Sequence, residues 1–343
     1  MPGPETRKPS RCPRASWLIT SEMLTRCFAQ ADVDRIAGAT ESRLPQTDAL
    51  TDEAQMDAIA GAELIITGWG TRPVTPAMLD AAPDLGLMCH SAGSVKHLVN
   101  EAFAERGIRV CSAASALAVG VAEFAFGLML VSMKAAWQFN DATRTGAWQR
   151  DQQAAWIREP YGATVGIVGA SLVGREMIRL CRNLDLGALL LCDPYITAEE
   201  AGALGTVKVE LDELMRRSDV VSLHTPATDE TRNLINAANL SLLKDNAIFI
   251  NTARGMCVDE GALIPELQSG RIMAFLDVTN PEPPEAGSPL YSLPNCILTP
   301  HIAGAVKENT HRQGRLVADQ VEAFVGGGAL PSEVDLAQLD HLA

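Results

Sequence analysis

The chain has 343 residues, 47% of them hydrophobic, and this length predicts two domains. Its formal net charge of −14 argues against a nucleic-acid partner, because phosphate binding requires a basic surface. Its eight cysteines show no CxxC or Cys/His spacing that suits zinc, so we expect reduced, packed thiols and no metal site.

The N-terminal third is predicted to contain a tail and a small domain. Residues 1–14 include Pro and Arg but lack the apolar core of a signal peptide, so we expect a flexible tail and a cytoplasmic protein. From residue 15 to 115, short apolar runs alternate with polar stretches of helix length, including 51–60 and 75–82. This alternation predicts a parallel α/β domain. A Gly/Ser turn at 91–94 follows one predicted strand, at the end where such sheets bind ligands.

The segment 117–138 is apolar, has no proline and only two glycines, and is predicted to form one long helix. Its apolar character on nearly all faces predicts burial between domains or against a second subunit. Glu123 and Lys134 interrupt the apolar run, which argues against a membrane span.

A second α/β domain is predicted after this helix. Six apolar runs between residues 163 and 301 are separated by segments of helix length, and their near-continuous apolar character is typical of strands in a buried parallel sheet. An amphipathic stretch at 306–326 is predicted to be a helix that ends at three consecutive glycines.

A nucleotide-binding turn is predicted at the start of this second domain. Gly169, Ser171 and Gly174 stand in the places of a G-x-G-x-x-G turn between a strand and a helix. Ser171 replaces the glycine that approaches the pyrophosphate, so it must fit without a clash or donate its hydroxyl to a phosphate. Asp193 ends the next strand, where a carboxylate accepts hydrogen bonds from a ribose and repels a 2′-phosphate. The turn and Asp193 together predict an NAD site and favour NAD over NADP. The alternatives are an ordinary strand-to-helix turn and a solvated aspartate.

Three residues with acid, base and anion-binding chemistry follow three later strands. Arg254, Glu282 and His301 occur in the stretches NTARG, NPEPPE and LTPHIAG. An arginine can clamp a carboxylate with two parallel hydrogen bonds, and a histidine backed by a carboxylate can exchange protons near neutral pH. The trio therefore predicts 2-keto or 2-hydroxy acid chemistry. Each residue has an alternative role: Arg254 could form a surface ion pair, Glu282 could be a solvated loop residue, and His301 could be packed in a loop.

These motifs together resemble those of the D-isomer-specific 2-hydroxyacid dehydrogenase family, over about residues 60–330. Residues 251–255 resemble its N-x-x-R-G turn and Asp277 its L-D-V strand end. Glu282 is similar to its E-P glutamate and His301 to the histidine of its P-H-x-x-G turn. The stretch HTPATDET at 224–231 also matches a family pattern.

The resemblance implies two Rossmann-like domains with parallel sheets and a cleft between them. Residues 15–115 and 306–335 would form a flavodoxin-like substrate-binding domain, and residues 116–305 a larger NAD-binding domain. The implied activity is NADH-dependent interconversion of a small 2-keto acid and its D-2-hydroxy acid by a homodimer.

The resemblance also implies the roles of the site residues. Arg254 would bind the substrate carboxylate and polarise the carbonyl, His301 would be the acid/base, and Glu282 would hold its tautomer, while Asp277 would contact the nicotinamide. The residues expected to line the cofactor are Gly169, Ser171, Leu172, Val173, Gly174, Asp193, His224, Thr225, Pro226, Thr231, Thr252, Ala253, Asp277, Ala303 and Gly304. The residues expected to bind substrate are Trp69, Ser91, Ala92, Gly93, Ser94, Arg254 and His301.

Two other functions remain open at this point. An NAD(H)-sensing, corepressor-like protein would use the same fold without turnover. A formate-type relative is expected to carry glutamine at the position of Glu282, so this residue argues against that branch. Ser91 and Lys96 depart from the usual pattern of the predicted substrate turn, so the side chain of the substrate is left unassigned.

Overall fold

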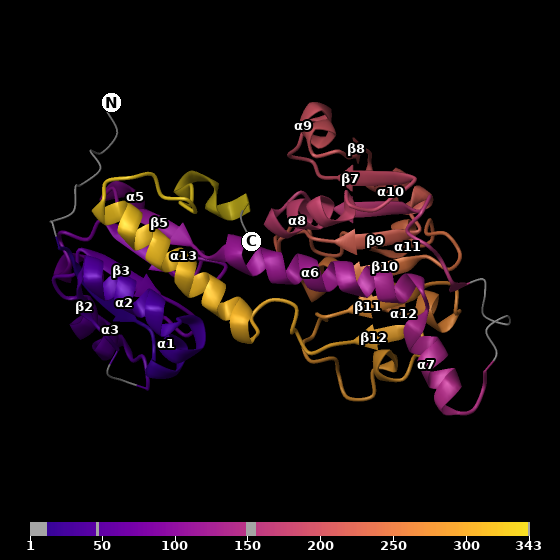
Figure 1. The fold of residues 1–343 in the computed structure, drawn as a ribbon, viewed down its shortest axis with the longest axis horizontal. Helices are drawn as coiled ribbons and strands as arrows, with labels where there is room; N and C mark the ends of the chain where they lie inside the picture. The colour runs from indigo at the N-terminus through magenta and orange to yellow at the C-terminus, as the bar shows by residue number, and fades with distance from the viewer. Residues whose placement is uncertain (1–11, 46–47, 149–155, 342–343) are drawn as a thin grey trace. The chain divides into compact units, whose positions relative to one another are not determined.

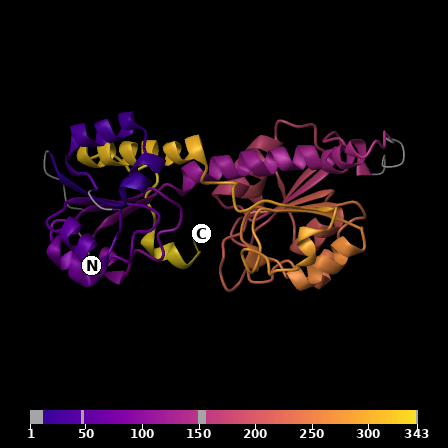
Figure 2. The same cartoon turned by 90° about the horizontal axis from the view of Figure 1, so that it is seen from below.

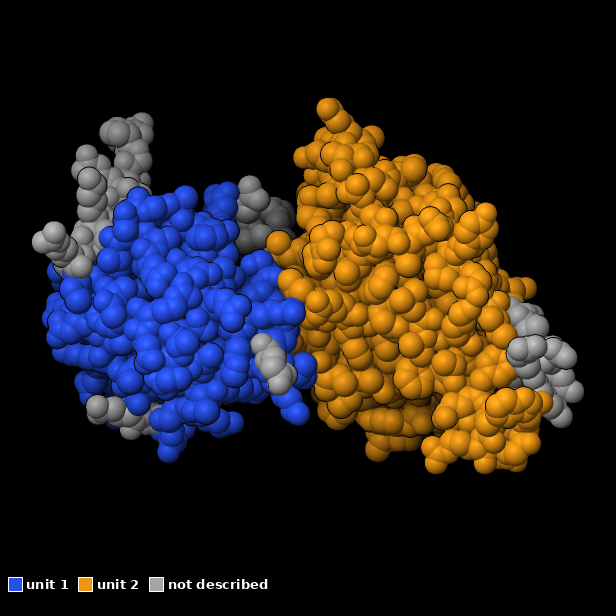
Figure 3. All heavy atoms as spheres, viewed as in Figure 1, with its two compact units in different colours: residues 1–117, 305–343 blue, residues 118–304 orange. Residues whose placement is uncertain are grey.

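The computed structural model describes residues 12–45, 48–148 and 156–341, and the chain divides into two compact units (Figure 1). Unit 1 comprises residues 1–117 and 305–343, and unit 2 comprises residues 118–304 (Figure 3). The boundaries expected from the sequence lie after residues 115 and 305.

Unit 1 is built on a parallel sheet, five-stranded within the described residues, with the order β2-β1-β3-β4-β5. Its strands are β1 (Arg14–Leu18), β2 (Glu41–Arg43), β3 (Leu64–Thr67), β4 (Leu87–His90) and β5 (Arg109–Ser112). This is the strand order of flavodoxin-like folds, as expected. Strand β1 begins at Arg14, the last residue of the predicted tail, and residues 1–11 lie outside the described residues.

Helices cover both faces of this sheet, and several begin at side-chain caps. They are α1 (Ser21–Cys27), α2 (Gln30–Ala39), α3 (Asp52–Ile59), α4 (Pro76–Ala81), α5 (Glu101–Glu105) and the returning α13 (Lys307–Val325). The hydroxyl groups of Thr51 and Thr75 accept hydrogen bonds from the first turns of α3 and α4. Helix α13 packs closely on α1, because a Cβ at Gly314 would lie 2.3 Å from the carbonyl oxygen of Cys27.

The chain after α13 lies along the edge of the unit 1 sheet. The N–H of Ser112 donates to the carbonyl of Ser332, and the N–H of Val334 donates to that of Val110. Arg109 and Glu333 form a bidentate ion pair beside them, at 2.7 and 2.6 Å. A 3-10 helix, Leu336–His341, follows, so unit 1 extends beyond the predicted end at residue 335.

Unit 2 contains a parallel sheet with the order β12-β11-β10-β9-β6-β7-β8, seven strands in the part of the chain that the structure describes. Its strands are β6 (Thr164–Val168), β7 (Ala188–Cys192), β8 (Val207–Lys208), β9 (Val220–Leu223), β10 (Ile248–Asn251), β11 (Met273–Leu276) and β12 (Cys296–Leu298). Counted from β6, the order is that of a Rossmann fold with one additional strand, which confirms the predicted fold.

Two hydrophobic cores lie on opposite faces of the unit 2 sheet, as the alternation of side chains along the strands requires. One joins the sheet to α6 (Ala114–Met133), α8 (Leu172–Cys181) and α9 (Ala198–Ala203). The other joins it to α10 (Leu211–Arg217), α11 (Ala237–Leu240) and α12 (Glu260–Gln268). Figure 2 shows α6, in magenta, and α12, in orange, on opposite sides of the sheet.

The predicted single helix 117–138 is wrong, because two helices occupy this region. Helix α6 ends at Met133, Ala135 takes a left-handed conformation with φ of 48°, and α7 (Ala136–Arg144) begins there. No glycine or proline marks this break in the sequence. Helix α6 is long and apolar enough to span a membrane by length and composition alone, a test that core helices also pass.

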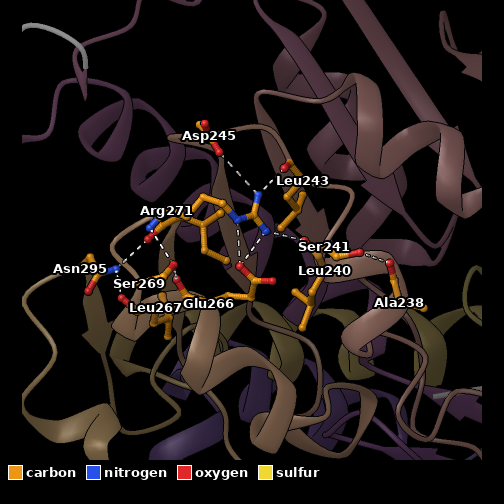
Figure 4. Close-up of polar contacts among 11 residues, drawn as sticks. Ala238, Leu240, Ser241, Leu243, Asp245, Glu266, Leu267, Ser269, Arg271 and Asn295 are labelled. Carbon is orange, nitrogen blue, oxygen red and sulfur yellow. Dashed lines mark hydrogen bonds and ion pairs between the residues drawn. The ribbon is translucent and has the colours of Figure 1, made fainter.

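Arg271 secures the end of the sheet opposite the predicted site (Figure 4). Its guanidinium donates to the carbonyls of Leu240 and Leu243, at the end of α11, and pairs with Glu266 of α12. Asn295 bonds the carbonyls of Leu267 and Ile272 from just before β12. These bonds fix the beginnings of β11 and β12, whose other ends carry predicted site residues.

Candidate active site

The carboxyl edge of the unit 2 sheet brings the predicted cofactor and catalytic residues together. Six strands end just before one of them: β6 before Gly169, β7 before Asp193, β9 before His224, β10 before Arg254, β11 before Asp277 and β12 before His301. Since β10 and β12 are separated only by β11, the backbones of Arg254 and His301 follow strands about 10 Å apart. Both residues therefore lie at the same edge of the sheet.

The turn after β6 is shaped by two glycines that no larger residue could replace. Gly169 has a φ of +98°, and a Cβ there would lie 2.8 Å from the carbonyl oxygen of His224. A Cβ at Gly174 would lie 2.0 Å from the carbonyl oxygen of Gly169. Ser171 fits without strain, with a φ of −62°, and caps α8 by accepting a hydrogen bond from the N–H of Gly174. The N-terminus of α8 therefore points its free N–H groups at this turn, as in pyrophosphate sites.

Asp193 is held against this turn. One carboxylate oxygen accepts a 2.7 Å hydrogen bond from the N–H of Ala170, and the other accepts from the N–H of Tyr195. The Tyr195 hydroxyl in turn donates to Glu230. Each carboxylate oxygen has a second lone pair, so Asp193 remains able to accept from a ribose hydroxyl.

Three buried polar atoms at the carboxyl ends of β9 and β10 have no partner among the described residues: His224 Nδ1, Thr225 Oγ1 and Thr252 Oγ1. Buried polar atoms in folded proteins are nearly always hydrogen-bonded, so these atoms fit the polar groups of a bound dinucleotide. Burial lowers the pKa of His224 to about 3, so it is a neutral hydrogen-bonding group and not a proton donor.

Further predicted cofactor residues lie in α8 and in the loop after β9. Thr231 donates its hydroxyl to the carbonyl of Pro226 and so shapes the loop after His224. Leu172 is 52% exposed at the first position of α8, and Val173 is partly buried beside it.

The predicted catalytic pair is in contact. Nδ1 of His301 lies 2.7 Å from Oε1 of Glu282, and both side chains are about half exposed. The contact leaves His301 Nε2 as the ring nitrogen available to a substrate. Among the described residues His301 is neither packed in a core nor solvated alone, so those alternatives do not hold.

Asp277 holds the turn that carries His301. Its buried carboxylate accepts hydrogen bonds from the Thr299 hydroxyl and from the N–H groups of Ile302 and Ala303. Its carbonyl accepts from the N–H of His301, which has an unusual left-handed φ of 55°. Asp277 therefore fixes the imidazole position, and no helix follows it to cap.

Arg254 stands at the end of β10 with most of its guanidinium free. Nη1 donates to the carbonyl of Ala253, and the side chain forms no ion pair among the residues that the structure describes. The turn itself is held by Asn251, which accepts from the N–H of Ala253 and donates to the carbonyl of Arg254. The remaining N–H donors fit an incoming carboxylate.

The predicted substrate residues of unit 1 lie at the carboxyl ends of β3 and β4. Trp69 follows β3, and residues 91–94 follow β4. The backbone N–H and the hydroxyl of Ser91 both donate to the carbonyl of Thr67, so Ser91 cannot offer its N–H to an anion as expected. The N–H groups of residues 92–94 have no hydrogen-bond acceptor in the described part of the chain, and they can still form an anion-binding turn.

Sequence reasoning missed two residues near these sites. The Arg26 guanidinium lies 5.3 Å from the centre of the Trp69 ring, at a distance typical of a cation–π contact. Glu260 accepts a hydrogen bond from the N–H of Asn280, in the loop of Glu282. Neither contact has a sequence signal, since the partners are joined only by the fold.

Gly174→Ala tests the cofactor turn. Because the added methyl would lie 2.0 Å from the carbonyl oxygen of Gly169, the turn must open. We expect the affinity for NADH to fall about tenfold or more, as measured by fluorescence titration. Gly202→Ala is the matched control, since nothing lies within 4 Å of its added Cβ. Equal affinities in the two variants would contradict this assignment.

Comparison with known proteins finds relatives that are dehydrogenases and reductases. Residues 126–303 match the model of the D-isomer specific 2-hydroxyacid dehydrogenase family, NAD binding domain. The chain is 31% identical over 280 residues to a hydroxypyruvate reductase of Thermotoga maritima, covering 81% of this chain and 89% of the relative. It is 32% identical over 292 residues to a D-3-phosphoglycerate dehydrogenase of Methanocaldococcus jannaschii, covering 84% of this chain but only 55% of that protein.

Solved structures agree with this assignment. The apo form of D-mandelate dehydrogenase from Rhodotorula graminis superimposes with a TM-score of 0.77 at 25% identity, covering 94% of this chain and 97% of that one. The chain spans about half the length of the two archaeal D-3-phosphoglycerate dehydrogenases that it matches. With the family model covering more than half of its length, the chain belongs to the D-isomer specific 2-hydroxyacid dehydrogenase family and carries that family's NAD-binding domain.

Proposed function

We propose that this protein is an NAD(H)-dependent oxidoreductase that interconverts a small 2-keto acid and its D-2-hydroxy acid. The observation that carries the proposal is the 2.7 Å contact between Glu282 and His301, at the same sheet edge as Arg254 and the dinucleotide turn. A neighbouring proton donor, anion clamp and cofactor turn meet the needs of carbonyl reduction.

The chemical roles follow from the free atoms of each side chain. Arg254 binds the substrate carboxylate and polarises the keto oxygen with its unoccupied N–H donors. His301, protonated, donates from Nε2 to the oxygen as the carbonyl carbon is reduced. Glu282 accepts from Nδ1 and holds the tautomer that leaves Nε2 facing the substrate. A bound nicotinamide supplies the hydride, and in the oxidative direction neutral His301 accepts the hydroxyl proton.

The names of the relatives support small substrates. Relatives of 31–33% identity include a hydroxypyruvate reductase, a glyoxylate reductase from Korarchaeum cryptofilum and a glycerate dehydrogenase. Asp193 supports NADH over NADPH, because its carboxylate repels a 2′-phosphate. All eight cysteines are free thiols, which supports a cytoplasmic location.

A substrate panel tests the proposal. Purified protein is mixed with NADH or NADPH and with glyoxylate, hydroxypyruvate, pyruvate or bulkier 2-keto acids, and cofactor oxidation is followed by absorbance. We expect substrate-dependent oxidation that is faster with NADH. NADH binding without turnover on any substrate would refute the proposal and favour the corepressor-like alternative.

Arg254→Ala is expected to remove most of kcat/KM for reduction, a loss on the order of 3 kcal/mol, because a charge-assisted bidentate contact is lost. Arg254→Lys keeps the charge without the fork, so we expect an intermediate loss. Arg216→Ala, on an exposed surface of α10, is the control. Steady-state kinetics that give equal losses for Arg254→Ala and Arg216→Ala would exclude Arg254 as the clamp.

Glu282→Gln should slow the reduction. Without the carboxylate, Nδ1 of His301 loses its charge-assisted partner and the imidazole is held less firmly, so we expect kcat to fall about tenfold or more with an unchanged dissociation constant for NADH. Glu285→Gln, in the same loop, should leave kcat unchanged. A kcat of Glu282→Gln equal to that of the wild type would mean that Glu282 does not act on His301.

We also propose that a second copy of the chain covers α6 and α7. Only 39% of the apolar window of α6 is buried, and α7 has no buried residue. Trp137 and Trp148 are exposed by 38% and 87% in the same part of unit 2. Apolar surface of this kind on a soluble chain is typical of a protein interface.

Light scattering tests this interface. We expect twice the chain mass of 36.6 kDa for the wild type and a shift toward the monomer for Trp137→Glu. Leu44→Glu, at an exposed apolar residue of unit 1, should remain dimeric. A wild-type protein that elutes as a monomer would refute the dimer.

A further inference from the structure

Glu260 joins the segment that carries Arg254 to the loop that carries Glu282. It is the first residue of α12, and its Oε1 accepts a 2.6 Å hydrogen bond from the backbone N–H of Asn280. Asn280 lies two residues before Glu282. The hydrogen bond therefore holds the base of the loop from which Glu282 reaches His301.

The carboxyl group of Glu260 is in an unfavourable place for a charge. The side chain is partly buried, and burial raises the pKa of Glu260, while the hydrogen bond from Asn280 opposes this effect. It forms no ion pair in the part of the chain that the structure describes. Burying a carboxylate without a cation costs free energy, and the position at a helix N-terminus offsets only part of that cost. The backbone N–H of Asn280 requires a hydrogen-bond acceptor, and the carboxylate of Glu260 supplies it.

The same loop is held from a second side by the turn after Arg254. A Cβ at Gly255 would lie 2.0 Å from the carbonyl oxygen of Thr279 and 2.7 Å from the nitrogen of Asn280. The backbone after Arg254 thus packs directly on the loop base, and the Thr279 hydroxyl donates to the carbonyl of Pro281 within it. Two neighbours, Gly255 and Glu260, fix this loop.

We propose that Glu260 is a positioning residue of the proton relay: by holding the Asn280 amide it sets the loop so that Glu282 meets Nδ1 of His301. Glu260 touches neither substrate nor cofactor in this role. It also ties the Arg254 turn to the Glu282 loop, so the anion clamp and the proton donor are held by one framework. This inference rests on the proposed function, because it assigns Glu260 to the same site.

Three variants separate this role from general stability. Glu260→Leu removes the acceptor, Glu260→Gln keeps a carbonyl acceptor, and Glu285→Leu changes an exposed acid of the same loop. We expect kcat of Glu260→Leu to fall about tenfold to a hundredfold, with an unchanged dissociation constant for NADH. Glu260→Gln and Glu285→Leu should behave like the wild type.

An activity-independent measurement completes the test. In protein labelled with ¹⁵N-histidine, the His301 signals are assigned from His301→Gln, and Glu260→Leu should shift the Nδ1 signal in the direction that Glu282→Gln does. If Glu260→Leu does not fold by circular dichroism, Glu260→Ala, which adds no bulk, takes its place.

The outcomes distinguish this inference from the proposed function. A wild-type kcat and an unshifted Nδ1 signal in Glu260→Leu would overturn the positioning role, as would an equal kcat loss in Glu260→Gln. If the wild type reduces no 2-keto acid, the proposed function fails, and the NMR shift still decides whether Glu260 positions the pair.

Discussion

The buried carboxylate of Asp277 is the constraint on which the rest of the site depends. It accepts three hydrogen bonds from the segment after β12 and so holds His301 in a left-handed conformation. Such a backbone costs on the order of 1–3 kcal/mol, and it persists only where surrounding bonds determine it. With the turn fixed, the imidazole meets Glu282 through Nδ1 and presents Nε2 outward. The histidine is oriented by this turn, and Glu282 occupies its Nδ1.

The parallel sheet of unit 2 brings the site residues to one edge. Neighbouring parallel strands deliver the dinucleotide turn, His224, Arg254, Asp277 and His301 to one edge without any long loop. The glycine contacts at the turn after β6 and at Gly255 let backbone segments meet where side chains would separate them. The opposite end of the sheet is braced by Arg271, so the loops at the active edge extend from a rigid support.

Sequence patterns predicted the parts of this protein that rest on local chemistry or strong periodicity. Buried strands such as β9 and β10 are continuous apolar runs, and the glycine turn, Arg254, Glu282 and His301 stand in recognisable motifs. The strands β2 and β8 were not predicted, because they have only three and two residues and contain no apolar run. The break at Ala135 has no glycine or proline to mark it. Glu260 was missed because its partner Asn280 is 20 positions away.

The configuration of the reaction product distinguishes D-specific reduction at this site from the alternatives. The wild-type protein is incubated with a limiting amount of NADH and the 2-keto acid, other than glyoxylate, that oxidises it fastest, because the glycolate formed from glyoxylate is achiral. The hydroxy acid is then resolved by chiral chromatography. We expect one equivalent of the D-2-hydroxy acid per NADH consumed, and none in His301→Gln over the same time. Formation of the L-enantiomer, or undiminished product from His301→Gln, would refute the proposed site.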